Sequence, residues 1–77
     1  MIAVPNSRPD KVFSFVRQND TDKVFVAINF SDRPQAVTFK DSLYQGKYTD
    51  YFGGQPVELD ASTKLDLKPW GHQVFVK

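Results

Sequence analysis

Residues able to act as an acid, base or nucleophile are few in this sequence. His72 is the only histidine, and it lies beside Gly71 at the start of an apolar run. Nucleophilic catalysis requires a Ser, Thr or Cys beside a base that a third group orients. A single histidine at the mouth of a predicted strand is more typical of an exposed or partly packed residue than of a catalytic base.

The nine acidic residues do not form the carboxyl pair that glycoside hydrolysis requires. Most lie in predicted turns or at water-facing strand positions: Asp20, Asp22, Asp32, Glu58, Asp60 and Asp66. Such positions stay solvated. Gly53-Gly54 is an isolated pair rather than a phosphate-binding loop, and one histidine without any cysteine makes no metal site. We therefore expect no catalytic residue, no metal and no cofactor.

Flat aromatic rings are the remaining groups able to bind a ligand, and the sequence has seven Phe, three Tyr and one Trp. Sugar C–H faces stack on such rings, which makes Tyr48, Tyr51 and Trp70 candidate carbohydrate-binding residues. We favour another role for Trp70, which stands in a Pro-Trp-Gly stretch. A buried Trp contributes a large apolar area, so Trp70 is expected to close the end of the core or the joint to a neighbour.

Composition narrows the class of protein. The 77 residues make one small domain, which buries only about 60% of the surface that its unfolded chain exposes. A net charge of +1 with interspersed signs argues against nucleic-acid binding. No apolar run approaches the ~20 residues of a membrane span. The first residues lack a secretory signal, so either the protein is cytoplasmic or the sequence is a piece of a longer one, and its localisation stays open.

The elements that must position these residues begin with a hairpin. Residues 12–18 and 23–30 are rich in Val, Ile and Phe, and residues 19–22 favour a turn. A symmetric turn pairs Phe15 with Val26 and Phe13 with Ile28. Side chains alternate across a strand, so one face carries Phe13, Phe15, Val24, Val26, Ile28 and Phe30. The opposite face carries Val12, Ser14, Val16, Gln18, Phe25, Ala27 and Asn29.

The rest of the chain also favours short strands. They are expected at residues 1–4 on an edge, 36–39, 47–52, 57–60, 64–68 and 72–76, with Leu43 and Tyr44 of the loop at 40–46 turned inward. No window has helical periodicity. Seven or eight short strands with regular turns predict an all-β antiparallel sandwich or barrel.

Several segments in this order and spacing resemble the C-terminal β-domain, or domain C, of α-amylase-family enzymes, glycoside hydrolase family 13. They are Val12-Phe-Ser-Phe-Val-Arg-Gln18, Val24-Phe-Val-Ala-Ile-Asn-Phe-Ser31, Tyr48-Thr-Asp50, Leu65-Asp-Leu-Lys-Pro-Trp-Gly71 and Val74-Phe-Val76. The resemblance covers nearly the whole chain. It implies a Greek-key β-sandwich that follows a catalytic (β/α) barrel and packs against it. The family's catalytic carboxylates belong to the barrel, so the resemblance carries none of them to this chain.

The hairpin has apolar residues on both faces, which suggests that a partner covers one of them. We take the first face as the core. Our hypothesis is that the second face docks on the barrel of the same polypeptide, through Val12, Val16, Phe25 and Ala27 together with Phe75. The expected function is a non-catalytic domain that stabilises a glycosidase acting on α-glucans. The alternatives are an independent carbohydrate-binding module and a free-standing immunoglobulin-like interaction domain.

Overall fold

The computed structural model describes residues 2–19, 22–40 and 44–77 and contains eight strands, with no helix among these residues. The strands are β1 Ile2–Ala3, β2 Val12–Gln18, β3 Lys23–Asn29, β4 Gln35–Thr38, β5 Gly46–Asp50, β6 Pro56–Leu59, β7 Lys64–Leu67 and β8 His72–Val76. All their pairings are antiparallel. The all-β prediction is therefore confirmed, and the predicted strands differ from the observed ones mainly at their ends.

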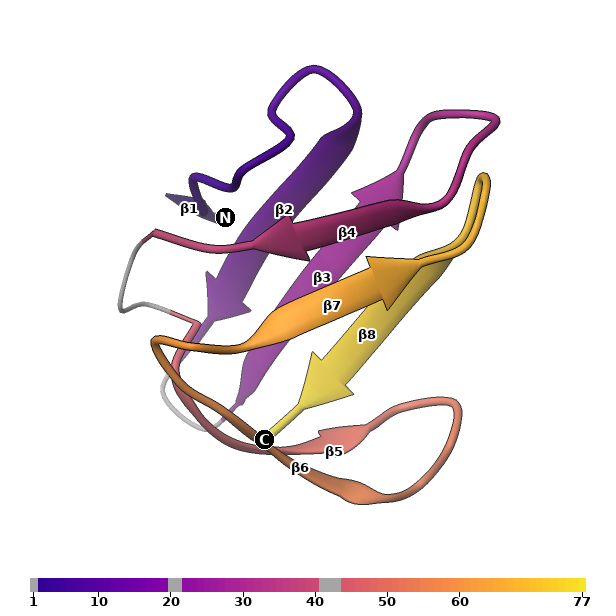
Figure 1. Cartoon of the computed structure of the whole chain (residues 1–77). Coiled ribbons are helices and arrows are strands. Elements are labelled where there is room, and N and C mark those ends of the chain that lie inside the picture. The colour runs from indigo at the N-terminus through magenta and orange to yellow at the C-terminus, as the bar shows by residue number, and fades with distance from the viewer. Residues whose placement is uncertain (1, 20–21, 41–43) are drawn as a thin grey trace.

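The strands form two layers. The larger sheet has the order β1-β2-β3-β8-β5-β6, and the smaller sheet contains β4 and β7. Figure 1 shows β4 and β7 lying across β2, β3 and β8. The chain passes from the larger sheet to the smaller one after β3 and again after β6, and it returns each time. The molecule is therefore a β-sandwich with one broad layer and one narrow layer.

The β2–β3 hairpin has the predicted register. Phe13 pairs with Ile28, Phe15 with Val26, and Arg17 with Val24. Of the turn that joins the two strands, Asp20 and Thr21 lie outside the described residues. Correct pairing means that the two sets of alternating side chains are also the predicted ones.

The assignment of these two faces to core and exterior was wrong. The residues predicted to dock on a barrel are 0–3% exposed and belong to the core cluster of this chain: Val12, Val16, Phe25, Ala27 and Phe75. The small β4–β7 sheet covers them with Val37, Leu65 and Leu67, which are also buried. These five residues are thus unavailable to another domain. The face that was taken for the core points outward.

Aromatic rings fill the middle of the core. Phe25 is fully buried and makes an edge-to-face contact with Phe39, with ring centroids 5.1 Å apart. Its ring also lies 5.6 Å from that of Tyr44 and 6.1 Å from that of Phe75. Tyr44 is buried, as predicted, whereas Leu43 lies outside the described residues. Aromatic pairs at these separations are favourable beyond the area that they bury.

Asn29, at the end of β3, joins the two sheets. Its side-chain nitrogen donates to the carbonyl oxygens of Arg33 at 2.8 Å and Lys68 at 3.0 Å, and its side-chain oxygen accepts from the Ser31 hydroxyl at 2.7 Å. Asn29 is only 1% exposed, and these bonds satisfy its amide. The amide therefore fixes the place where the chain leaves the large sheet relative to the end of β7.

Candidate functional site

Three adjacent strands of the large sheet carry apolar side chains on the side that faces away from the β4–β7 sheet. We call this surface the outer apolar face and define it by seven residues of β2, β3 and β8: Phe13, Phe15, Val24, Val26, Ile28, Val74 and Val76. Phe13 is 39% exposed and the other six are half-buried. An antiparallel sheet with one side in water normally shows polar residues on that side.

Pairing across strands makes the outer apolar face continuous. Phe15, Val26 and Val74 form one row across three adjacent strands. The rings of Phe13 and Phe15 lie 5.3 Å apart between their centroids. Polar residues occur at the margins, where exposed Arg17 pairs with Val24 and exposed His72 pairs with Ile28. The surface thus has an apolar centre and a partly polar rim, as protein interfaces do.

The aromatic residues of the β5–β6 turn extend this surface. The Phe52 ring lies 5.2 Å from that of His72 and 5.1 Å from that of Tyr51, both in edge-to-face geometry. Tyr51 and Phe52 are 66% and 65% exposed. His72 contacts this exposed pair of rings, which agrees with its interpretation as a partly packed strand residue.

The three candidate carbohydrate-binding residues lie in different environments. Tyr48 is 3% exposed and belongs to the core cluster, so neither face of its ring is open to a sugar. Tyr51 and Trp70 are exposed, the second by 65%. They lie on different turns, Tyr51 after β5 and Trp70 before β8. The structure therefore leaves Tyr51 and Trp70 as candidates and excludes stacking on Tyr48.

Trp70 does not close the end of the core, contrary to the expectation from its sequence context. Its backbone has a φ of 56°, a left-handed conformation that is rare for bulky residues. Its N–H donates to the Ser31 carbonyl at 3.0 Å, and the N–H of Gly71 donates to the Lys68 carbonyl at 2.8 Å. A Cβ at Gly71 would lie 2.9 Å from that same carbonyl oxygen. This tight turn presents the indole to the outside.

Tyr48 lies between two lysine side chains. The Lys23 and Lys77 ammonium groups are 5.9 and 5.6 Å from the centre of its ring, within the range of cation–π attraction. Burial lowers the pKa of Lys23, and the charge of Lys77 lowers it further. Burial raises the pKa of Tyr48, whose hydroxyl is buried without a hydrogen-bond partner. The surroundings of Tyr48 thus include two lysine side chains and one buried polar atom without a hydrogen bond, the Tyr48 hydroxyl oxygen.

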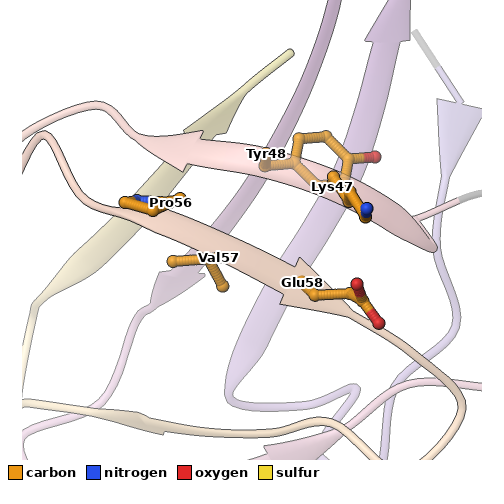
Figure 2. A pocket seen from close by; sticks show the side chains of 5 residues that line it. All are labelled: Lys47, Tyr48, Pro56, Val57 and Glu58. Atoms are coloured by element: carbon orange, nitrogen blue, oxygen red, sulfur yellow. The ribbon is translucent and has the colours of Figure 1, made fainter.

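A small hollow lies between β5 and β6 beside Tyr48. Figure 2 shows its lining, with Lys47 and Tyr48 from β5 and Pro56, Val57 and Glu58 from β6. Its volume is about 240 Å³, which is below the roughly 300–1,000 Å³ typical of small-molecule sites. A second hollow, of about 260 Å³, lies at the turn end of the β2–β3 hairpin, beside Val76 of β8. Neither hollow has the size of a usual substrate pocket.

Two of the acidic residues, Asp50 and Asp60, stabilise local turns. Asp60 accepts hydrogen bonds from the backbone and hydroxyl of Ser62, which lower the pKa of its carboxyl group. Asp50 accepts in the same way from backbone N–H groups of the β5–β6 turn. Among the described residues, no three metal-binding side chains lie together, and no helix is long and apolar enough to cross a membrane.

Sequence reasoning identified the members of the outer apolar face that lie on β2 and β3, but not its exposure or the addition of Val74 and Val76 from β8. Phe13, Phe15 and Val26 were placed on one face and assigned to the core. Phe52 was treated only as the end of a strand. Ser14 and Asn29 favoured the wrong assignment, because polar residues on one face of a hairpin usually mark its exterior. In the structure both are buried and hydrogen-bonded.

Comparison with known proteins gives the family. Residues 1–74 match the family described as "Maltogenic Amylase, C-terminal domain". The chain is also similar to three oligo-1,6-glucosidases of Saccharomyces cerevisiae (strain ATCC 204508 / S288c), IMA2, IMA3 and IMA4. Each is 33% identical over 67 residues, which is 86% of this chain and 11% of the relative. The chain therefore spans only about a ninth of the length of these relatives, a share of 11%.

The match extends over both sheets of the sandwich, because residues 1–74 include all of β1 to β7 and the first half of β8. It agrees with the resemblance seen in the ordered motifs from Val12 to Val76. The chain belongs to the family of maltogenic amylase C-terminal domains and is the C-terminal β-domain of an α-amylase-family enzyme.

Proposed function

We propose that this chain is a non-catalytic accessory domain that packs against the catalytic part of its parent glycosidase and stabilises it. The observation that supports this most is the match of residues 1–74 to a family of C-terminal domains. Relatives of which this chain corresponds to 11% have most of their length elsewhere, and their names describe a glucosidase activity. By this proposal the parent enzyme acts on α-glucans, and its reacting groups lie outside the 77 residues.

The proposed mechanism is burial of apolar surface between domains. An interface within one chain typically covers about 600–1,500 Å². Apolar area removed from water contributes roughly 25 cal/mol per Å². Even after the loss of side-chain freedom, contact of this size stabilises both domains. A small sandwich with many exposed hydrophobic side chains gains from such contact in the same way as its larger neighbour.

The test is a deletion in the full-length parent enzyme. Removal of these 77 residues is expected to lower the melting temperature by several degrees. Hydrolysis of a small α-glucoside per folded molecule, measured well below that temperature, should persist. An unchanged melting temperature would contradict the proposed role. Loss of the chemical step in a deletion protein that remains folded would show that the domain contributes to catalysis itself.

A second candidate function is direct binding of α-glucan through exposed rings. The observation in its favour is that Tyr51 and Trp70 are 66% and 65% exposed. Affinity electrophoresis of the 77-residue chain in soluble starch tests it, with Tyr51→Ala and Trp70→Ala as matched variants. Retardation of the wild-type chain that both variants lose would support glucan binding. Equal mobility with and without starch would exclude it.

A further inference from the structure

We infer that the outer apolar face, rather than the inward residues, is the surface on which the catalytic part of the parent enzyme docks. This inference rests on the proposed function and adds the identity of the surface. It names Phe13, Phe15, Val26 and Ile28 as its centre. These residues belong to the two strands that form the leading hairpin.

Burial gives the first step of the argument. The inward-facing apolar residues of β2 and β3 are already buried in the core cluster, with Val37, Leu65 and Leu67 of the small sheet and with Phe39 and Tyr44, so a neighbour cannot reach them. The outer apolar face has no cover from any described residue, although its rows of Val, Ile and Phe cross three strands. Apolar patches of this kind on small soluble domains usually mark contact surfaces.

The smaller sheet provides an internal control. Its outward residues are exposed and mostly polar: Ala36, Thr38, Lys64 and Asp66. Sheets of this domain can therefore carry a water-compatible exterior. The apolar exterior is specific to β2, β3 and β8, since it extends neither to the small sheet nor to β5 and β6, which carry exposed Lys47, Thr49 and Glu58.

The path of the chain gives the occupant. In a C-terminal domain the preceding polypeptide enters through β1, which lies at the edge of the large sheet beside β2. Ala3 of β1 pairs with Phe15, so the entering chain meets the margin of the outer apolar face itself. Figure 1 shows β1 and the N-terminus at this edge of the larger layer. The domain that directly precedes β1 in the parent enzyme is thus held next to the outer apolar face.

The polar residues lie at the rim of the outer apolar face, which favours an interface with few charges at its centre. Among the residues that flank the outer apolar face, Arg17 is exposed at one end and His72 at the other. The exposed rings of Tyr51 and Phe52 continue the surface beyond His72. The chemistry that fits is an apolar patch on the catalytic part with polar or acidic groups opposite Arg17.

Cysteine labelling tests this directly, because the chain contains no cysteine of its own. Val26→Cys places a thiol at the centre of the outer apolar face, and Ala36→Cys places one on the outward side of the small sheet. Both changes are small and are expected to leave the fold intact. Each variant is made in the 77-residue chain and in the full-length enzyme. Labelling by a maleimide is followed at each site by peptide mass spectrometry, so that other cysteines of the enzyme do not interfere.

We expect the thiol at position 26 to react at least ten times more slowly in the full-length enzyme than in the 77-residue chain. The thiol at position 36 should react at the same rate in both. Protection at position 36 instead of 26 would overturn the inference while leaving the accessory role intact. Protection at neither position, together with an unchanged melting temperature on deletion, would overturn the proposed function as well.

A second copy of the chain is the alternative occupant, and the same variants reveal it. Protection of position 26 in the 77-residue chain that rises with protein concentration, with a dimer in analytical ultracentrifugation, would assign the surface to self-association. If the protection of position 26 also rises with protein concentration in the full-length enzyme, docking within one polypeptide is contradicted.

Discussion

The two exteriors of this sandwich differ more than the two sides of its large sheet. On β4 and β7, the outward positions carry Thr38, Lys64 and Asp66, while the inward positions carry buried Val37, Leu65 and Leu67. Strands β2, β3 and β8 of the large sheet carry apolar residues on both sides, whereas its strands β5 and β6 carry exposed Lys47, Thr49 and Glu58. The small sheet therefore has the pattern of an independent antiparallel sheet, and the β2–β3–β8 part of the large sheet has the pattern of a sheet covered twice.

Under the proposed function, this difference would allow a domain of this size to pack against a neighbour while its own core is complete. The inward side of the large sheet is closed by the chain itself. Only its outward side is left for contact. The following predictions compare these two sides and the features that keep them apart, in order of decreasing effect.

The largest contrast is expected between Phe25, on the inward side of β3, and Phe15, on the outward side of β2. In the 77-residue chain, Phe25→Ala should lower the free energy of unfolding by about 3–5 kcal/mol, because the ring is fully buried among other rings. Phe15→Ala should cost about 1 kcal/mol or less. Urea unfolding followed by fluorescence measures both. Equal costs would mean that the outward side is not an open surface.

The next effect concerns the joint between the two sheets. Asn29→Ala removes the amide that bonds to the carbonyl oxygens of Arg33 and Lys68, and leaves the Ser31 hydroxyl without one of its partners. We expect a loss of about 1–3 kcal/mol in the free energy of unfolding. Gln18→Ala, at an exposed position of β2, is the control and should change it by less than about 0.5 kcal/mol. Similar values for the two variants would exclude Asn29 as the joint.

Removal of the hydroxyl group should affect stability differently at the two buried tyrosines, Tyr48 and Tyr44. Tyr48→Phe removes a buried hydroxyl that has no partner, so it should leave stability unchanged or raise it by about 1 kcal/mol. Tyr44→Phe removes a 2.7 Å hydrogen bond to the Asp60 carbonyl and should lower stability by about 1 kcal/mol. Chemical denaturation of both variants at neutral pH decides this. A destabilising Tyr48→Phe would indicate that the hydroxyl is satisfied.

The pH dependence follows from the same pair. Burial raises the pKa of both phenols, so the unfolded chain loses these protons at lower pH than the native chain. The contribution of the two neutral phenols to the free energy of unfolding is fully present below about pH 10, the ordinary pKa of tyrosine. It is lost as the pH rises through their pKa values in the native chain. Tyr48→Phe should therefore lose less stability than the wild type between pH 9 and 11, in denaturation curves across that range.

The smallest effect is expected at Trp70, in the tight turn between β7 and β8. Its φ of 56° is strained for a residue with a Cβ and easily adopted by glycine. Trp70→Gly should raise the free energy of unfolding of the 77-residue chain by about 0.5–1 kcal/mol. Trp70→Ala keeps the Cβ and serves as the control, without a gain. If the two variants behave alike, backbone strain is not the relevant property of this position.

The strands and the hairpin register could be predicted from the sequence because they depend on local alternation and on turn residues. The face of the hairpin that points away from the core could not be predicted in this way. Alternation separates Phe15 and Val26 from Phe25 and Ala27, but it does not say which set faces inward. That choice depends on which side β4 and β7 cover, and their four-residue runs carry little information about it.

Whether each candidate sugar-binding residue is buried or exposed also depends on features that local sequence patterns do not predict. Tyr48 is buried because Thr49 pairs with Val76, which turns Tyr48 to the inward side. This pairing joins residues far apart in the sequence, and local patterns do not predict it. Trp70 was expected to close the end of the core or the joint to a neighbour, because Trp carries a large apolar area, and the structure rules out the first of these. The left-handed backbone of its turn presents the ring outward instead.

The position of β8 in the large sheet has a consequence for biosynthesis. β8 is the last strand in the sequence but lies between β3 and β5 in the sheet. During translation, β1 to β3 and β5 to β6 can form only as separate halves until residues 72–76 leave the ribosome. A polypeptide that ends before β8 would have two unpaired inner edges, which are sites of aggregation. Quality control of the nascent enzyme would thus depend on the arrival of five residues.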